Sequence, residues 1–407
     1  MSSIYANSYL TLAATGSYSD DGGLFFRHPK ATMPGISRTG IDYQIHARPV
    51  IDHMDDAQFP LFKRAWVFQE RLLAPRVLHF GRQELFWECN EAVNCECGGI
   101  FGERYGTGQE KFMSKTTHQE ALLKQDIKHL RRRWHAIVEE YSQLSLTRVR
   151  DRLPALSGIA KQMAAQGERR GKYLAGLWSD TLGPDLLWFR QDAMSAHPVP
   201  KWRAPSWSWA SIEGQIKYFD APAVVESPST PVAGGEIPSL KTNHLMILEE
   251  AARAANPDNA YGEVLSAHLR LRGILAPVAV FDGRSLSSRT LLLRRRAPRK
   301  GSLRTAHYEF RFENSDSTNS YPFFADYDLH KLDATFTVAR FSILFVGTDT
   351  GEDEYALLLK RIHEEQNTWE RVGLFTTKFS RWSSNDHREV YFAALNSGVV
   401  PVDFTLV

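Results

Sequence analysis

The prevailing spacing of the apolar residues differs between the two parts of this chain of 407 residues, and the difference limits what each part can fold into. Before residue 220, apolar side chains recur every three or four residues in several stretches, which is typical of amphipathic helices. After residue 244 the period is mainly two, in short runs between charged or glycine-containing turns, which predicts antiparallel strands. Residues 221–243 are rich in Pro, Gly and Ser and predict a linker or a long surface loop.

The clearest local pattern is a helix followed by a hairpin within residues 61–88. The helical stripe consists of Leu61, Ala65, Phe68 and Leu72. Pro75 ends this run, because proline cannot continue a helix. Val77–Phe80 and Glu84–Glu88 then flank the three residues Gly-Arg-Gln, which predicts two strands joined by a tight loop.

Other patterns predict elements on both sides of this pair. Residues 9–14 and 43–47 read as strands, and residues 116–144 read as one long amphipathic helix. A further helix should follow Pro154. In APSWSWAS, residues 204–211, Trp207 and Trp209 alternate with serines, which predicts a strand whose aromatic face completes a core; a stacking platform for a base or sugar is the alternative.

Composition narrows the class of protein. Hydrophobic residues make up 43% of the chain, which is typical of a folded protein and not of a disordered one. The 49 basic and 47 acidic residues nearly balance, so a nucleic-acid partner is not indicated. No stretch approaches the roughly 18 apolar residues of a membrane span. We expect a soluble cytoplasmic protein, with the nucleus as an alternative location.

The cysteines raise the question of a metal site. Cys89, Cys95 and Cys97 lie close together, with His79 upstream, and thiolates with an imidazole are ligands that zinc accepts. The spacing C-x5-C-x-C contains no paired C-x2-C loops, so we predict free thiols, no metal and no bound cofactor. A Cys-His nucleophile is equally unsupported, and the glycine-rich phosphate loops and the G-x-S-x-G elbow are absent.

A series of motifs resembles a known family. RAWVFQERLLAPRVLHFG, FWEC, YLAGLW, LLWF and RAPSWSWAS, in this order, are similar to motifs of the fungal heterokaryon incompatibility (HET) domain proteins. The opening IYANSYLTLAATGSYSDDGGLF resembles the strand and turn ahead of the same helix, so the motifs span much of residues 4–219. The S-Y-C-W-G-like and W-I-D-x-x-C-I-x-Q-like strands of the family have no counterpart, and we expect only the downstream part of the HET domain here.

The resemblance implies a fold. HET domains are regarded as related to the TIR fold, a doubly wound α/β sheet. We therefore expect a partial TIR-like α/β domain with the hairpin at residues 1–100 and a helical segment at 101–220 that ends in the WSWAS strand. After the linker at 221–243, a β-rich region should fill residues 244–407, which makes the chain α+β overall.

The resemblance also implies a function and leaves alternatives. Its family members act in non-self recognition, called vegetative incompatibility, and in programmed cell death, so the expected partners are other incompatibility or signalling proteins, with no nucleic acid and no membrane. TIR enzymes cleave NAD with a glutamate four residues after a tryptophan, and Trp66 and Glu70 reproduce that spacing. The chain could therefore be an NAD glycohydrolase-like enzyme, with Glu70 catalytic and Trp66 supporting, or a degenerate member without activity.

Chemistry allows either role for Glu70. Cleavage of a glycosidic bond passes through an oxocarbenium-like state, which a nearby carboxylate stabilises. The plainer interpretation places Glu70 beside the apolar stripe of its helix, paired with Arg64 or Arg71. Whether Glu70 is catalytic or only paired on the helix surface depends on its position in the folded chain.

Overall fold

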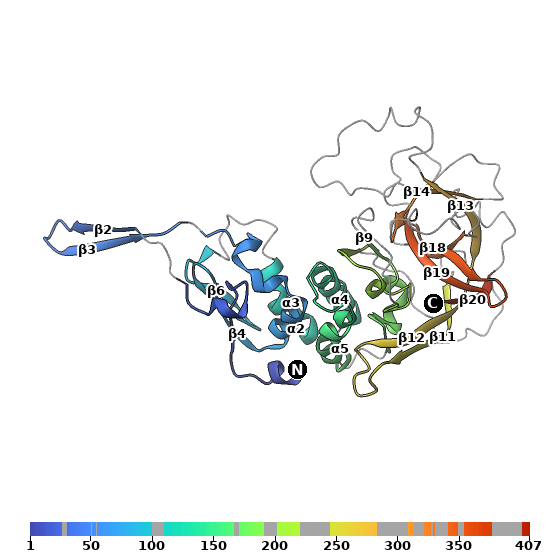
Figure 1. Cartoon of the computed structure of the whole chain (residues 1–407), viewed down its shortest axis with the longest axis horizontal. Coiled ribbons are helices and arrows are strands. Elements are labelled where there is room, and N and C mark those ends of the chain that lie inside the picture. Colours follow the sequence, from blue (N-terminus) through green and yellow to red (C-terminus); the bar gives the residue numbers. More distant parts are fainter. Residues whose placement is uncertain are drawn as a thin grey trace, which may run out of the picture. The chain divides into compact units, whose positions relative to one another are not determined.

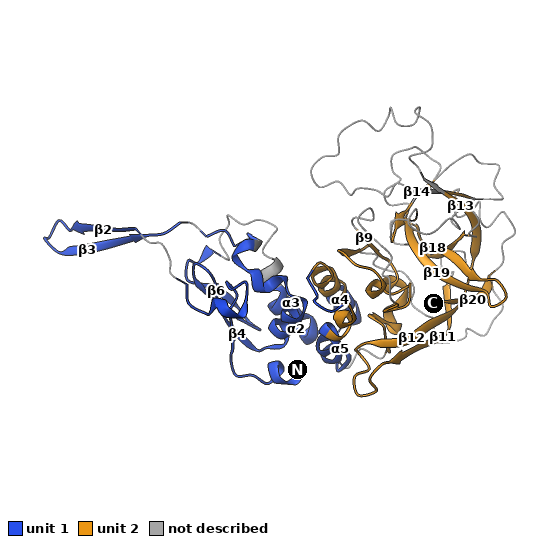
Figure 2. Cartoon of the chain, viewed as in Figure 1, with its two compact units in different colours: residues 1–133, 144–148, 155–168 blue, residues 134–143, 149–154, 169–407 orange. Residues whose placement is uncertain are grey.

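The computed structural model describes residues 1–26, 31–49, 51–53, 55–99, 110–124, 126–166, 171–190, 202–219, 245–282, 308–312, 321–326, 329, 341–348, 354–376 and 401–407. The chain divides into two compact units (Figure 2). Unit 1 comprises residues 1–133, 144–148 and 155–168, and unit 2 comprises the rest. The domain boundaries expected at residues 100, 220 and 243 stay predictions, and the expected linker lies outside the described residues.

Unit 1 contains a four-stranded sheet in the order β1-β4-β5-β6. Figure 1 labels two of its strands, β4 and β6. Its strands are β1 (Thr11–Ala13), β4 (Arg76–Phe80), β5 (Leu85–Cys89) and β6 (Val93–Cys95). β1 runs parallel to β4, with Thr11 opposite Val77, so the chain between them is a crossover. β4 and β5 form the hairpin predicted from the sequence, and β6 adds an antiparallel edge.

The crossover contains helix α2 (Ala65–Leu73), where the apolar period predicts it. Ala65, Phe68 and Leu72 are buried along one face, as expected of an amphipathic helix that packs on a sheet. The Ala65 N–H, left unpaired inside the helix, donates to the carbonyl of Ser145 at 3.0 Å. Leu61 lies before α2, in a short 3₁₀ turn.

The remaining helical elements of unit 1 are α1 (Ser2–Ala6), η1 (Asp20–Gly22), η2 (Asp56–Gln58), η3 (Pro60–Lys63), α3 (Glu110–Lys124) and α5 (Ser157–Ala164). Helix α4 (Ile127–Ser142) begins in unit 1, and its residues from Trp134 onward belong to unit 2. α5 confirms the helix expected after Pro154. The single helix expected at 116–144 is wrong, because α3 and α4 divide there. Asp126 caps α4, since its carboxylate accepts from the Lys128 N–H at 3.3 Å and its carbonyl accepts from the Leu130 N–H at 2.9 Å.

A second, two-stranded sheet lies before α2. β2 (Ala31–Ile36) and β3 (Asp42–Ala47) pair antiparallel, with Met33 opposite Ile45. The strand expected at 43–47 is thus confirmed, and its partner β2 is an addition, because Pro34 and Gly35 broke the strand pattern there. Figure 1 shows the two strands as a hairpin of their own.

Short elements precede the large sheet of unit 2. They are η5 (Val149–Arg152), η6 (Pro154–Leu156), β7 (Tyr173–Leu174), β8 (Leu177–Trp178), η7 (Ser179–Thr181), α6 (Leu182–Asp185), β9 (Trp188–Arg190), η8 (Trp209–Ser211) and β10 (Ile216–Tyr218). The WSWAS strand is wrong, since this segment forms a turn and the 3₁₀ turn η8. Trp207 and Trp209 are nonetheless fully buried, as a core role requires.

Side-chain hydrogen bonds explain the turn at WSWAS. The Ser208 hydroxyl caps η8 by accepting from the Ala210 N–H at 3.0 Å. The Trp209 indole N–H donates to the carbonyl of Gly176 at 3.0 Å, and the Trp134 indole N–H donates to the same carbonyl at 2.8 Å. Gly176 has φ +102°, and a Cβ there would lie 2.7 Å from the Trp209 indole nitrogen, so only glycine fits.

The C-terminal part of unit 2 is a ten-stranded sheet. Its strands are β11 (Leu245–Ala254), β12 (Val264–Gly273), β13 (Leu275–Asp282), β14 (Tyr308–Phe312), β15 (Tyr321–Pro322), β16 (Phe324–Ala325), β17 (Phe341–Thr348), β18 (Glu354–His363), β19 (Thr368–Thr376) and β20 (Val402–Leu406). Within the described residues, all pairings of this sheet are antiparallel except that of β19 with β20. The runs TLLLRRR and VYFAAL, also expected as strands, lie outside the described residues.

One arginine of β19 connects the sheet to the turns before it. Arg371 is fully buried and donates to Asp326 at 3.0 Å and to the Leu186 carbonyl at 2.6 Å. Its guanidinium also lies 3.4 Å from the centre of the Trp188 ring and donates to the Trp188 carbonyl. A buried charge is tolerated only when it is paired and hydrogen-bonded in this way.

The described residues therefore confirm a mixed α+β chain, with a βαβ crossover in unit 1. The TIR-like assignment remains an expectation. None of the helices in the described part of the chain is long and apolar enough to cross a membrane.

The Arg371 contacts predict a large difference between two arginine substitutions. Arg371→Met leaves Asp326 buried without its partner and should lower the free energy of unfolding by roughly 3–5 kcal/mol. Arg272→Met removes an exposed pair with Asp403 and should leave stability close to the wild-type value. Urea unfolding followed by tryptophan fluorescence measures both, and equal effects would contradict the assignment.

Candidate functional site

Trp66 and Glu70 lie one turn apart on α2, as their spacing predicts. Both side chains are half-buried, at the border between the packed face and the exposed face of the helix. Position 70 is thus reachable from solvent. The helix itself is positioned by its buried neighbours.

A tyrosine from α1 lies beside Glu70. Partial burial raises the pKa of Tyr5, and the nearby negative charge of Glu70 raises it further. The sequence suggested that Glu70 pairs with Arg64 or Arg71, but the carboxylate that Arg71 binds is that of Glu88.

The residues on each side of Glu70 have structural partners. The Gln69 side-chain oxygen is buried and accepts from the Gly158 N–H of α5 at 2.5 Å. A Cβ at Gly158 would come within 2.8 Å of that oxygen and 2.4 Å of the Ser2 Cβ, so the close approach of α1, α2 and α5 requires glycine. Arg71 points to the sheet instead.

Arg71 neutralises a buried carboxylate of the hairpin. Its Nε donates to Glu88 Oε2 at 2.7 Å and its Nη2 donates to Oε1 at 2.8 Å, a two-pronged pair between α2 and β5. Glu88 is 1% exposed. Its second neighbour is His79 of β4, whose Nε2 lies 3.1 Å from Oε2.

The protonation of this group follows from its partners. Burial alone would raise the pKa of Glu88, but the charge of Arg71 and the hydrogen bonds from His79 and Arg71 hold it well below its usual range. Burial lowers the pKa of His79 to about 4, against the effect of Glu88. We therefore assign a neutral His79 that donates through Nε2 to Glu88 and accepts through Nδ1 from the Thr15 hydroxyl, 2.8 Å away.

A lysine completes the polar contacts at the end of α2. Lys115 of α3 is 1% exposed, and its ammonium donates to the carbonyls of Arg71 and Ala74. These are among the carbonyls left unpaired at a helix C-terminus, where a cation is also favoured by the helix dipole. Burial lowers the pKa of Lys115 to about 8. The buried charges of Arg71, Glu88 and Lys115 therefore stabilise the fold of unit 1.

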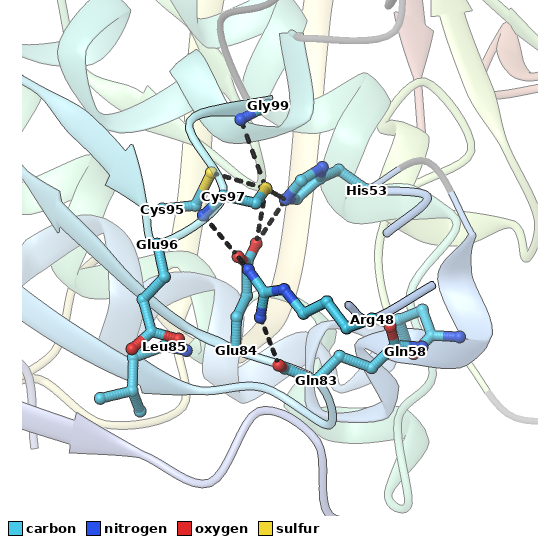
Figure 3. A network of polar contacts seen from close by, with 10 residues as sticks. All are labelled: Arg48, His53, Gln58, Gln83, Glu84, Leu85, Cys95, Glu96, Cys97 and Gly99. Carbon is cyan, nitrogen blue, oxygen red and sulfur yellow. Dashed lines mark hydrogen bonds and ion pairs between the residues drawn. The ribbon is translucent and has the colours of Figure 1, made fainter. Parts of the chain in front are cut away.

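The three cysteines separate into two environments. Cys89 ends β5, and His79 is engaged with Glu88, so neither joins the other thiols. Cys95 and Cys97 instead lie beside His53 and Glu84 (Figure 3). The four potential ligand atoms all lie within 4.8 Å of one another, a grouping that sequence spacing did not reveal.

The contacts within this cluster are short. His53 Nε2 lies 2.6 Å from Glu84 Oε1, and Cys97 Sγ lies 3.4 Å from the same oxygen and 3.7 Å from His53 Nε2. The two sulfurs of Cys95 and Cys97 are 3.4 Å apart. Imidazole, carboxylate and two thiols are a donor set that can hold a divalent cation.

Two further groups orient the cluster. Glu84 Oε2 accepts from Arg48 Nη2 at 3.2 Å and from the Cys97 N–H at 2.9 Å, which leaves Oε1 facing His53 (Figure 3). The Gly99 N–H donates to Cys97 Sγ at 3.3 Å. Partial burial, together with the hydrogen bonds to Cys95 and Glu84, raises the pKa of the Cys97 thiol to about 12 although the Gly99 N–H lowers it.

His79 predicts an acid-sensitive stability. Between about pH 6.5 and 4 the unfolded chain binds a proton at His79 that the folded chain excludes, so the free energy of unfolding falls as the pH is lowered through this window. The contribution is roughly 3 kcal/mol. His79→Gln keeps a donor for Glu88 and an acceptor for Thr15 without titrating, and should lose less stability across the window.

Urea unfolding at a series of pH values measures this slope. Burial lowers the pKa of His118 to about 3, so part of the pH dependence of stability should remain in His79→Gln. His46→Gln, at an exposed position of β3, is the matched control. An unchanged slope in His79→Gln would contradict the neutral, buried His79.

Comparison with known proteins supports the resemblance for part of the chain. The family model of the heterokaryon incompatibility protein (HET) matches residues 1–70. The matched segment runs from α1 through Glu70 and includes the β2–β3 hairpin and most of α2. Searches of curated proteins and of solved structures found no match.

Proposed function

We propose that this protein acts in fungal non-self recognition, or vegetative incompatibility, and signals programmed cell death through contacts with other proteins. The HET family match over residues 1–70 supports the biological role. The observation that carries the mode of action is the β2–β3 hairpin, which lies within the matched segment and presents an apolar face to solvent.

The register of the hairpin separates its side chains into two faces. Met33, Gly35, Tyr43 and Ile45 lie on one face together with Ala31 and Ala47. Thr32, Pro34, Gln44, His46, Ile36 and Asp42 lie on the other. The first set is apolar and the second is mostly polar. Alternation of this kind is typical of a strand pair with one buried side.

The apolar face is exposed in this chain. The exposed fractions are 51% for Met33, 47% for Tyr43 and 49% for Ile45. Within the described residues, β2 and β3 pair only with each other. An isolated two-stranded hairpin is marginally stable in water, and contiguous exposed apolar side chains mark interaction sites. The hairpin therefore fits a partner that covers this face.

The expected partner is another incompatibility or signalling protein with an apolar surface or a strand edge. Each strand of the hairpin has an outer edge that carries backbone donors and acceptors, so a partner strand can extend the sheet. Contact of this kind requires no cofactor. It suits a protein of the cytoplasm or nucleus, with no nucleic acid and no membrane as partner.

NAD cleavage by Glu70 is the second candidate function. It is favoured by the placement of Trp66 and Glu70 one turn apart on α2, both half-buried. Against it, Gln69 and Arg71 on either side of Glu70 make structural hydrogen bonds with Gly158 and Glu88. A degenerate member without activity is the third alternative.

A cell-death assay in fungal hyphae tests the proposal. The full chain should raise the fraction of cells that take up a vital dye, and Met33→Ser with Ile45→Ser should reduce this effect at least fivefold because the apolar face is lost. Thr32→Ser with Gln44→Ser changes the opposite face and should retain activity. Both pairs alter exposed side chains, so folding should be preserved, which circular dichroism checks.

Glu70→Gln distinguishes the second candidate in the same assay. Retained cell death and unchanged NAD in hyphal extracts are expected. If Glu70→Gln abolishes both cell death and an NAD loss caused by the wild-type chain, NAD cleavage replaces the proposal. Contact through this face is contradicted if the wild-type chain causes no cell death. It is also contradicted if Met33→Ser with Ile45→Ser is as active as Thr32→Ser with Gln44→Ser.

A further inference from the structure

We propose that His53, Glu84, Cys95 and Cys97 form a structural zinc site in unit 1. Two thiolates, one imidazole and one carboxylate are typical zinc ligands, and four protein ligands leave no open position for catalysis. The proposal is independent of the function proposed above, because it rests on different residues.

The distances fit a tetrahedral ion after small shifts. With Zn–S bonds of about 2.3 Å and Zn–N or Zn–O bonds of about 2.0 Å, neighbouring ligand atoms in a tetrahedron are roughly 3.3–3.8 Å apart. Cys95 and Cys97 Sγ are 3.4 Å apart, and Cys97 Sγ is 3.7 Å from His53 Nε2. The His53–Glu84 contact of 2.6 Å must open by less than about 1 Å, and the S–S distance by a few tenths of an ångström.

The backbone positions the two thiols. Cys95 ends β6, opposite Phe86 of β5, and Cys97 follows in a turn. Gly98, with φ +68°, continues this turn, and its N–H donates to the Cys95 carbonyl at 3.1 Å. The conformation suits glycine and brings Cys97 Sγ beside Cys95 Sγ.

The surrounding charges balance an ion. Two thiolates and the Glu84 carboxylate contribute three negative charges, so a bound zinc ion leaves a net charge of −1. The guanidinium of Arg48 supplies the compensating positive charge, because it donates to Glu84 Oε2 at 3.2 Å and also to the Gln83 carbonyl. Arg48 is a positioning residue, which holds Oε2 while Oε1 faces the ion.

The site would join segments that are distant in the sequence. His53 follows the β2–β3 hairpin by a few residues, Glu84 lies in the β4–β5 loop, and the cysteines follow β5. A bound ion would fasten the segment after the hairpin to the sheet of unit 1. Zinc sites of this closed kind stabilise small folds that contain little core.

Metal content of the purified full chain tests the site directly. After expression in zinc-containing medium and dialysis, the wild-type chain should retain one equivalent of zinc by mass spectrometry of the metal. Replacement by Co²⁺ should produce a thiolate-to-cobalt charge-transfer band and the visible spectrum of a tetrahedral ion. Zinc should also raise the thermal unfolding midpoint.

The cysteines provide a matched control. Cys97→Ser should weaken zinc binding at least tenfold in competition with a chromogenic chelator, whereas Cys89→Ser, outside the cluster, should bind as the wild type does. Arg48→Met should weaken binding about 10–100-fold, as expected for a group that orients a ligand. Circular dichroism verifies that each variant folds.

Several results would overturn the site. One is the absence of a thiolate-to-cobalt band in the reduced wild-type chain. Another is an equal zinc affinity of Cys97→Ser and Cys89→Ser. The third is a stable Cys95–Cys97 disulfide in protein purified without added oxidant. The cobalt measurement needs no variant, so it decides the question even where a substitution impairs folding.

Discussion

A single buried carboxylate, Glu88, determines how α2 and the following hairpin are joined. Burying an unpaired carboxylate costs several kcal/mol, so Glu88 requires a permanent partner. Arg71 meets this requirement with two hydrogen bonds from α2, and neutral His79 adds a third from β4. One charge thereby connects the helix to both strands of the hairpin and sets which way each face of α2 points.

The buried Glu88 pair limits which side chains of α2 can contact a ligand or a partner. Gln69 and Arg71 are committed to packing, whereas Trp66 and Glu70 face partly outward. The tryptophan–glutamate spacing that resembles a TIR enzyme is thus compatible with a helix whose main role is structural. Strands β2 and β3, by contrast, pair with no other strand within the described residues, and the apolar face of their hairpin is exposed.

Local patterns predicted much of the fold, because helix α2, the β4–β5 hairpin and the strands of the large sheet are periodic. The break between α3 and α4 was missed because one cap, Asp126, outweighs continuous amphipathic spacing. WSWAS was misassigned because Ser208 and Trp209 bond to positions 175 and 176, distant in sequence. The helical position of Glu70 was predictable from local spacing. The cluster of His53, Glu84, Cys95 and Cys97 was not, because its members come from separate segments of the chain and His53 and Glu84 belong to no motif.

Urea unfolding of the full chain, compared between Arg71→Met and Glu70→Gln on the same helix, measures how much the buried Arg71–Glu88 pair contributes to stability. Arg71→Met should lower the free energy of unfolding by roughly 3–5 kcal/mol because Glu88 stays buried without its main partner. Glu70→Gln should cost about 1 kcal/mol or less, since Glu70 is half-buried and glutamine has nearly the same shape. A small effect at Arg71, or an equal one at Glu70, would contradict the central role of the buried pair.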